Sequence, residues 1–345
     1  MENIERLRVI SCFFIILLHV WAPVRLSVSG QNRNFCTIVN GICNTGVSCF
    51  VLISGFFGVK LKWRRIVELT VAASGYSLLA LGISCLLGVE KYVSVGALLK
   101  ASFPIIFNQN WFICCYIALL LFSPFINEYL DSISIQKHLY LCVTLLIIFS
   151  IIPTFFYYEL PGTSCKGLFH IIMVYTIGKF IAKWGGMKKI RTKMIILLLI
   201  CSVGITILAN FALLLFTGED KEYFSRDCSV FIIISSILIF LITLKASETK
   251  VKYTKVSRYC LDIYLIHDSL VLAIFNYFIF DFSKYLTSWK IIVFTILEGI
   301  LCLFVSYVIS LIFHPCFSWL SDKIYTICRN MWDILEKKIK VLLIK

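Results

Sequence analysis

Charged residues are scarce in this chain, and their scarcity excludes most classes of protein. Only 15% of its 345 residues are Asp, Glu, Lys or Arg, whereas 60% are hydrophobic. The mean hydropathy of +0.91 is far above that of a water-soluble globular domain. Its long apolar runs are continuous, so they lack the alternation of membrane β-barrel strands. The composition therefore predicts an all-α integral membrane protein that crosses the bilayer many times.

Metal-site patterns are missing as well. The chain has five histidines, and no Cys or His pair has the spacing of a zinc site, so no metal is expected. Cysteine is abundant, with 15 residues, but the cysteines are scattered. Many lie inside apolar runs: Cys12, Cys49, Cys85, Cys142, Cys201 and Cys302. We therefore expect packing thiols and not an exterior built on disulfides.

Acidic residues are few, 19 against 33 Lys and Arg, which gives a net charge of +14. We assign this excess to basic loops that meet anionic membrane lipid, and we expect no nucleic-acid partner. A cleavage site of small residues is also absent after the first apolar run, where Trp21-Ala-Pro-Val-Arg25 follows. The run is therefore expected to remain as a membrane span and not to be removed as a signal peptide.

Ten apolar segments each approach the roughly 20 residues that a helix needs to cross a bilayer. They cover residues 9–26, 37–59, 66–88, 111–130, 138–157, 165–184, 193–216, 227–244, 259–280 and 290–313. With the N-terminus in the cytoplasm, the inside segments hold 24 of the 33 Lys and Arg residues. This bias predicts about ten spans in a plasma or inner membrane, with both termini cytoplasmic.

Two segments differ from the spans. Residues 92–107 are short and interrupted, which is typical of an external interfacial or re-entrant helix. Residues 321–345 mix Trp332 and Leu335 with lysines, which predicts a basic amphipathic helix on the inner leaflet. We therefore expect one transmembrane domain over 1–320 followed by a cytoplasmic tail. Internal repeats are not evident in the sequence.

The first span carries Arg8 at its entry and His19 eleven positions later. Eleven helical steps come within about 20° of three full turns, so both residues share one stripe, separated by roughly 16 Å of rise. Ionisable groups are costly in lipid, which makes them candidates for function. The alternative is structural: Arg8 reaches the lipid headgroups and His19 hydrogen-bonds a neighbouring helix.

Other ionisable residues also lie at depth. His267 lies near the middle of the ninth segment beside Asp268, and Glu298 lies in the tenth. Histidine suits proton transfer near neutral pH, and a buried acid can orient a histidine. For His267 and Asp268, the alternative is a polar pair that packs two helices together. Asp268 and Glu298 are candidate orienting acids.

Aromatic and amide side chains open the fourth span. Asn110 and Trp111 stand at its outer end, and Tyr116 lies one turn further in. They could form a platform for a sugar or lipid, or Trp111 could belong to an interfacial aromatic belt. Small and polar residues follow one another along the second span and permit close helix contact: Asn44, Ser48, Ser54 and Gly55.

A basic stretch follows the second span on its inner side and contains Lys62, Arg64 and Arg65. Guanidinium and ammonium groups bind phosphate, so this stretch is a candidate clamp for an anionic donor. The alternative is that these residues only obey the positive-inside rule.

Four of these features together resemble the acyltransferase-3 family of membrane O-acyltransferases. The first is the spacing of Arg8 and His19, and the second is LISGFF (52–57) followed by basic residues. The third is NWFICCYIALLLFSPFIN (110–127), and the fourth is SRYCLDIYLIH (257–267). Each is weak alone, but their order matches the family and they extend over most of the chain.

The resemblance implies transfer of an acyl group, usually acetyl, from acetyl-coenzyme A to a hydroxyl of an exported or lipid-linked carbohydrate. It thereby implies an acyl-coenzyme A co-substrate. We expect no permanently bound cofactor, and from their depth and charge we expect His19 and Arg8 to be the catalytic residues. From their types and depth we expect His267 to bind the acceptor together with Asn110, Trp111 and Tyr116. No hydrolase-like segment follows the last span, so the stand-alone type is expected.

Some departures and alternatives remain. Asp268 stands where the family often has proline, and Lys62 with Arg65 stands where some members have two arginines. His19 could act as a general base on a sugar hydroxyl or accept the acyl group itself. A transporter or flippase of sugar-lipid is the rival function, although transporters commonly show inverted repeats. The sequence does not identify the acceptor sugar or separate acetyl from succinyl.

The predicted topology can be tested with reporter fusions. Fusions at Lys188 and Asp220 are expected to report opposite sides of the membrane, because one span separates these positions. Alkaline phosphatase is active outside and green fluorescent protein inside, so each site receives both reporters. Two fusions that report the same side would contradict the ten-span arrangement.

Overall fold

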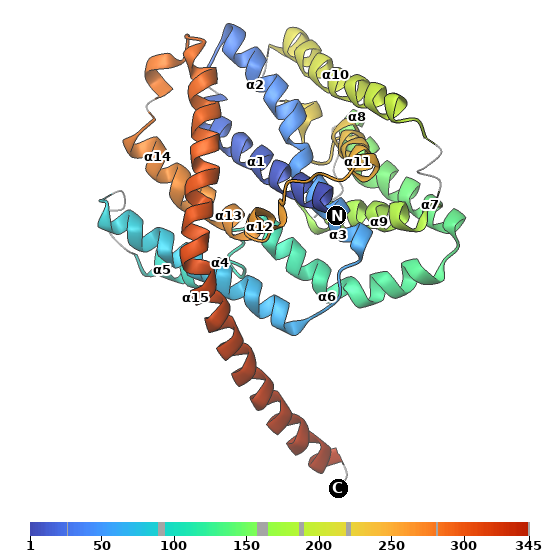
Figure 1. Cartoon of the computed structure of the whole chain (residues 1–345), viewed down its shortest axis with the longest axis vertical. Coiled ribbons are helices and arrows are strands. Elements are labelled where there is room, and N and C mark those ends of the chain that lie inside the picture. Colours follow the sequence, from blue (N-terminus) through green and yellow to red (C-terminus); the bar gives the residue numbers. More distant parts are fainter. Residues whose placement is uncertain are drawn as a thin grey trace.

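The computed structural model describes residues 1–25, 27–88, 94–156, 165–185, 190–218, 222–280 and 282–343. All regular structure in these ranges is helical, and none of them contains a strand (Figure 1). The longer helices are α1 (Glu2–Arg25), α2 (Gly30–Cys43), α3 (Thr45–Phe57), α4 (Trp63–Leu86), α6 (Trp111–Ser132), α7 (Ile135–Leu146), α9 (Leu168–Lys183), α10 (Thr192–Thr217), α11 (Val230–Lys245) and α15 (Lys290–Leu343). The shorter ones are α5 (Val95–Ser102), η1 (Ile147–Ile151), α8 (Ile152–Phe156), η3 (Tyr223–Ser225), α12 (Thr254–Ser257), α13 (Cys260–Ile266), η4 (His267–Leu272), α14 (Ala273–Phe278) and η5 (Phe282–Tyr285).

Eight helical stretches among the described residues are long and apolar enough to cross a membrane. This finding supports the all-α, multi-pass fold, while the count of ten and the side of each terminus stay predictions. Helix α9 has only 16 residues, and the predicted span 259–280 is divided among α13, η4 and α14. The predicted span 37–59 begins earlier in the structure than in the prediction, because its apolar stretch runs from Gly30 to Phe57 across α2 and α3.

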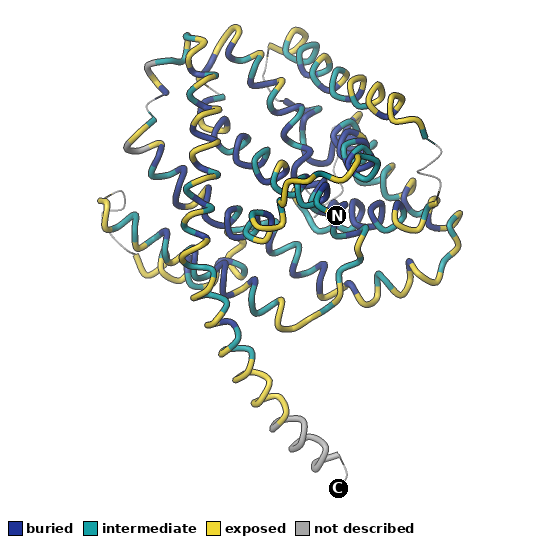
Figure 2. Tube along the Cα trace, in the orientation of Figure 1, coloured by how far each residue is buried: buried dark blue, intermediate teal, exposed yellow. Residues whose placement is uncertain are grey.

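The outer helices present apolar side chains to their surroundings. Exposed residues include Leu197 and Leu208 on α10 and Phe304 and Ile312 on α15. Figure 2 shows the opposite in the centre, where α1, α3 and α11 are largely buried. Exposed apolar surface on this scale suits contact with lipid and not with water.

Helices α3 and α9 cross so closely that two glycines are needed at the contact. A Cβ atom on Gly55 would lie 2.2 Å from the backbone oxygen of Tyr175. A Cβ atom on Gly178 would lie 2.4 Å from the backbone oxygen of Leu52. The close helix contact that the sequence predicts around Gly55 is therefore confirmed, and α9 is its partner.

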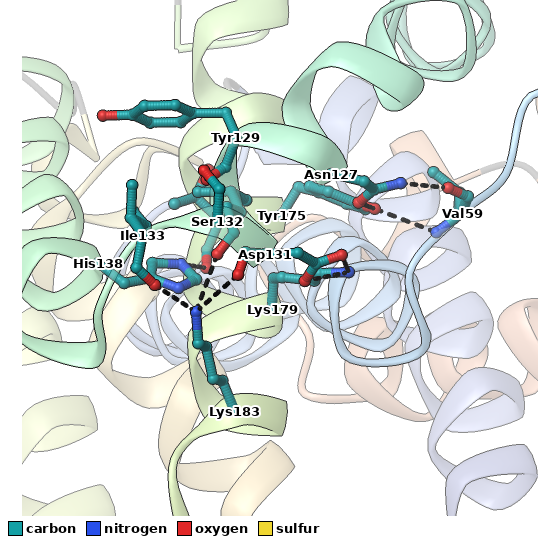
Figure 3. Close-up of polar contacts among 12 residues, drawn as sticks. Val59, Asn127, Tyr129, Asp131, Ser132, Ile133, His138, Tyr175, Lys179 and Lys183 are labelled. Atoms are coloured by element: carbon teal, nitrogen blue, oxygen red, sulfur yellow. Dashed lines mark hydrogen bonds and ion pairs between the residues drawn. The ribbon is translucent and has the colours of Figure 1, made fainter.

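A network of hydrogen bonds also connects α3 and α9 with α6 near the C-terminal ends of these helices (Figure 3). The Tyr175 hydroxyl donates to Asn127 Oδ1 at 2.7 Å and accepts from the Val59 amide at 3.1 Å. Asn127 Nδ2 in turn donates to the Val59 carbonyl oxygen at 2.8 Å. Nearby, the ammonium of Lys183 donates to the carbonyl of Ile133 at 2.5 Å, just beyond the end of α6. These bonds satisfy backbone groups that helix ends leave without partners.

One end of the bundle, called here the amino-terminal end, gathers segments that the topology predicts to share a side. Glu2 on α1 accepts from the Thr254 hydroxyl at 2.6 Å, beyond α11. Arg64 at the start of α4 pairs with Asp322 on α15 at 2.7 Å. The opposite end, called the distal end, holds the end of α1 and the start of α2. Lys188 and Asp220 lie outside the described residues.

Helix α15 contains the predicted tenth span and continues without a break to Leu343. Its 54 residues make it roughly 80 Å long, whereas the apolar core of a bilayer is about 30 Å thick. Figure 1 shows its C-terminal part leaving the body of the bundle. The division between a domain at 1–320 and a separate tail is therefore not marked by a helix end, and it stays a prediction.

The glycine contact gives a test of the packing. Gly55→Ala is expected to lower the thermal unfolding temperature of the detergent-purified protein, because its methyl group would overlap a backbone oxygen of α9. Overpacking of this kind costs about 1–3 kcal/mol. Gly82→Ala on α4 is the matched control, because no atom lies within 4 Å of its Cβ position. Equal unfolding temperatures for the two variants would contradict the close contact.

Candidate active site

Two histidines from distant parts of the chain meet inside the bundle. Nδ1 of His19 lies 2.7 Å from Nε2 of His267, and the two ring planes differ by only 9°. His267 is buried, whereas a third of the His19 side chain remains exposed to a cavity. The structure thus brings into contact the two deep histidines that the sequence singles out.

The hydrogen bonds of His267 assign the proton positions on both rings. Nδ1 of His267 lies 3.2 Å from the carbonyl oxygen of Ile263, which can only accept. Nδ1 of neutral His267 therefore carries the proton, and its Nε2 accepts from Nδ1–H of His19. This arrangement leaves Nε2 of His19 with a free lone pair. A histidine oriented in this way can act as a base or a nucleophile.

Local backbone geometry brings His267 to this position. The regular helix α13 ends at Ile266, and the π-helical turn η4 begins at His267. A π turn inserts an extra residue and rotates the side chains that follow, and such turns are frequent at functional sites. The sequence predicts one regular helix over 259–280, so this turn is a correction to it.

The two candidate orienting acids have different surroundings. Asp268 Oδ1 lies 3.9 Å from Nδ1 of His19, too far for a hydrogen bond. Glu298 on α15 is fully buried, and both of its carboxyl oxygens are without a hydrogen-bond partner in the described part of the chain. Asp268 is therefore beside the histidine pair, whereas Glu298 bonds to neither ring.

Two cavities meet at His19 on the distal side. The distal cavity, about 650 Å³, is lined by charged and amide side chains that include Arg25, Asn40 and Asp227. The lateral cavity, about 520 Å³, is lined by residues that include Asn110 and Asp268. The two cavities share four residues at their meeting point: His19, Trp111, Lys166 and Tyr264.

A third cavity, the arginine cavity of about 220 Å³, lies towards the amino-terminal end. Arg8, Arg65 and Arg258 line it, together with Tyr116 and Ser54. Arg65 and Arg258 are exposed, so the arginine cavity opens at this end of the bundle. Three guanidinium groups around one opening suit an anion such as phosphate.

The remaining predicted donor residues lie elsewhere. Arg64 forms its ion pair with Asp322 on α15 and lines none of these three cavities. Lys62 is exposed at the start of α4 and also lines none of them. The structure therefore gathers Arg8 and Arg65 but not Lys62 or Arg64. The donor role of Lys62, Arg64 and Arg65 stays a prediction.

The predicted acceptor residues divide between the cavities. Asn110 and Trp111 stand at the start of α6 and line the lateral cavity, and Trp111 also lines the distal cavity. Tyr116 lies one turn deeper and lines only the arginine cavity, with its ring packed on Phe112 at 5.9 Å. Tyr116 is expected from the sequence to bind the acceptor with Asn110 and Trp111, but it does not line either of the cavities that those two residues line.

Comparison with known families shows which family the chain belongs to. The model of a family described as "Acyltransferase domain", acyltransferase-3, matches residues 1–314. The chain belongs to the acyltransferase-3 family. Neither curated proteins nor solved structures give a further match. The protein is therefore a multi-pass membrane acyltransferase, and His19, Arg8 and His267 lie within the matched region.

The candidate site of the acyltransferase contains three features that the sequence does not reveal. Lys166 lines the distal cavity together with His19 and Asp227. A disulfide joins Cys165 to Cys228, which are the sequence neighbours of Lys166 and Asp227. The expectation of packing thiols alone is therefore wrong for this pair. Arg258, the third feature, looks from the sequence like an ordinary basic residue of a loop.

The disulfide generates a prediction about stability. Cys165→Ser and Cys228→Ser are expected to lower the unfolding temperature by similar amounts, because either change opens the same link. The double variant is expected to be no less stable than each single variant, since the pair acts as one unit. Closing a loop of 63 residues stabilises by roughly 4 kcal/mol in the chain-entropy model. Cys201→Ser, at an exposed free thiol, is the control. Additive losses in the double variant would contradict the link.

Proposed function

We propose that this acyltransferase moves an acetyl group from acetyl-coenzyme A to a hydroxyl of an exported or lipid-linked carbohydrate. The observation that carries the proposal is the position of the His19–His267 pair, between an arginine-lined cavity and two polar cavities. In this proposal the amino-terminal end faces the cytoplasm and the distal end faces outward.

The arginine cavity suits the donor. Coenzyme A carries phosphates and is found in the cytoplasm, where the positive-inside rule puts Arg8, Arg65 and Arg258. Arg258 has no acidic partner among the described residues, whereas Arg8 and Arg65 have Glu5 and Glu68 nearby. Guanidinium groups can bind a phosphate through two parallel hydrogen bonds. The acyl end of the donor would extend from there along α1 towards His19.

The distal and lateral cavities suit a carbohydrate acceptor. Their walls offer carboxylates, amides and hydroxyls, including Asp227, Asn44 and Ser269, which can bond to sugar hydroxyls. Trp111, on the wall between the two cavities, offers an aromatic face to the apolar side of a sugar ring.

The chemistry follows from the proton positions. Nε2 of His19 takes the proton from an acceptor hydroxyl as its oxygen attacks the thioester carbon. A C–O bond forms, the C–S bond breaks, and the same proton passes to the sulfur of coenzyme A. His267 holds the ring in position, and the carboxylate of Asp268 lies beside the His19 ring that is protonated between these steps. Direct transfer suits a site where donor and acceptor cavities meet, so we assign His19 as a general base and not as an acyl carrier.

The test combines glycan mass spectrometry with a variant. Cells that lack the gene are expected to lose acetyl groups from a surface or lipid-linked glycan, and the wild-type gene is expected to restore them. His19→Gln is expected to reduce acetyl transfer about 100- to 10,000-fold, because glutamine keeps hydrogen bonding but cannot carry the proton. Purified membranes supplied with acetyl-coenzyme A give the rate.

Controls separate chemistry from folding. The level and monodispersity of His19→Gln in detergent should equal those of wild type, since a lost interhelical hydrogen bond averages only about 0.6 kcal/mol in membranes. A well-folded His19→Gln protein with near-normal transfer would remove His19 from the mechanism. Unchanged glycans in the deletion strain would contradict the carbohydrate acceptor.

A further inference from the structure

One residue, Tyr264 on α13, lines all three cavities described above. The arginine cavity and the distal cavity also share Ile15 and Val47. The three side chains thus form a wall between the arginine cavity and the distal cavity. Ile15 and Val47 are buried on α1 and α3, whereas Tyr264 is only half-buried.

The contacts of Tyr264 leave its polar end free. Its ring meets the ring of Phe112 edge-on, with the two ring centroids 5.6 Å apart. The centroid of the His267 ring lies 5.8 Å from that of Tyr264. Among the described residues, none makes a hydrogen bond to its hydroxyl. A tyrosine hydroxyl away from water normally has a partner. The side chain is therefore packed along one side of its ring, and its tip stands where the cavities meet.

We propose that Tyr264 is the partition between the donor and acceptor cavities, so that only the acyl end of the donor passes it. The inference rests on the proposed function, because it assumes a thioester in the arginine cavity. The ring of Tyr264 fills the space between Phe112 and the His267 ring. It thereby closes the donor cavity to water from the distal end. The tyrosine acts by position and takes no part in bond making.

The partition has a chemical consequence. Nε2 of His19 can activate water as well as a sugar hydroxyl. With water, a C–O bond forms to the acetyl carbon and the C–S bond breaks, which gives acetate and free coenzyme A. Exclusion of water prevents side reactions of this kind. Loss of the ring should therefore convert transfer into hydrolysis.

The experiment measures both products from acetyl-coenzyme A labelled in its acetyl group. Purified protein in liposomes is compared with membranes that contain endogenous acceptor. Tyr264→Ala is expected to raise the ratio of free acetate to transferred acetyl by about tenfold or more. Tyr264→Phe keeps the ring and is expected to release acetate at the wild-type level. If Tyr264→Ala does not fold, Tyr264→Leu also removes the ring and takes its place.

Two controls identify the cause of any hydrolysis. Tyr307→Ala removes a tyrosine on α15 that packs against Tyr259 but lines none of the three cavities, and it should not raise acetate release. The double variant with His19→Gln and Tyr264→Ala should lose the extra hydrolysis, because His19 activates the water.

The outcomes are distinguishable. Wild-type protein that transfers acetyl, combined with a folded Tyr264→Ala or Tyr264→Leu protein without added hydrolysis, would overturn the partition alone. Added hydrolysis in Tyr264→Phe or in Tyr307→Ala would overturn it as well. Wild-type protein that neither transfers acetyl nor consumes acetyl-coenzyme A would overturn the proposed function, and the partition with it.

Discussion

A hydrogen bond between two imidazole rings joins α1 to the junction of α13 and η4 in the interior of the bundle. Polar groups in such surroundings are costly unless each has a partner. The chain of bonds from Ile263 through His267 to His19 satisfies three nitrogens and leaves the fourth facing the cavities. The regular part of α13, the π turn and the orientation of α1 are all needed for this single arrangement. The packing of α1 against its neighbours therefore also determines which ring nitrogens of His19 and His267 carry protons.

The two ends of the bundle are fixed by different means. At the amino-terminal end, side chains such as Asn127 bond to helix ends, and Arg64 on α4 pairs with Asp322 on α15. At the distal end, Glu222 accepts from Arg25 at 2.6 Å and from Asn40, which ties α1 and α2 to the start of the last third of the chain. The disulfide of Cys165 adds a covalent link there. The distal cavity thus combines side chains of α1, α2 and α6 with loop residues such as Asp227 that charge and a covalent bond hold, whereas the arginine cavity is lined mainly by helices.

Sequence reasoning found what depends on a single helix and missed what depends on contact between helices. The spacing of Arg8 and His19 needs only helical periodicity, so their common stripe could be predicted. The bond from His19 to His267 needs the tertiary fold, and the π turn leaves no known mark in the residues. Lys166 looks like an ordinary loop cation, and the pairing of Cys165 with Cys228 cannot be read from spacing. Tyr264 was part of a motif, but its position at three cavities follows only from packing.

The stripe on α1 explains why an arginine and a histidine stand eleven residues apart. Arg8, Ile15 and His19 all line cavities, so one face of a single helix runs from the donor opening to the acceptor side. The rise of a helix is fixed, which holds the charged end and the reacting end roughly 16 Å apart. One residue more or fewer between Arg8 and His19 would turn the imidazole about 100° away from this face. A flexible loop could not keep such a distance, whereas a helix packed between α3 and α15 keeps both the distance and the direction.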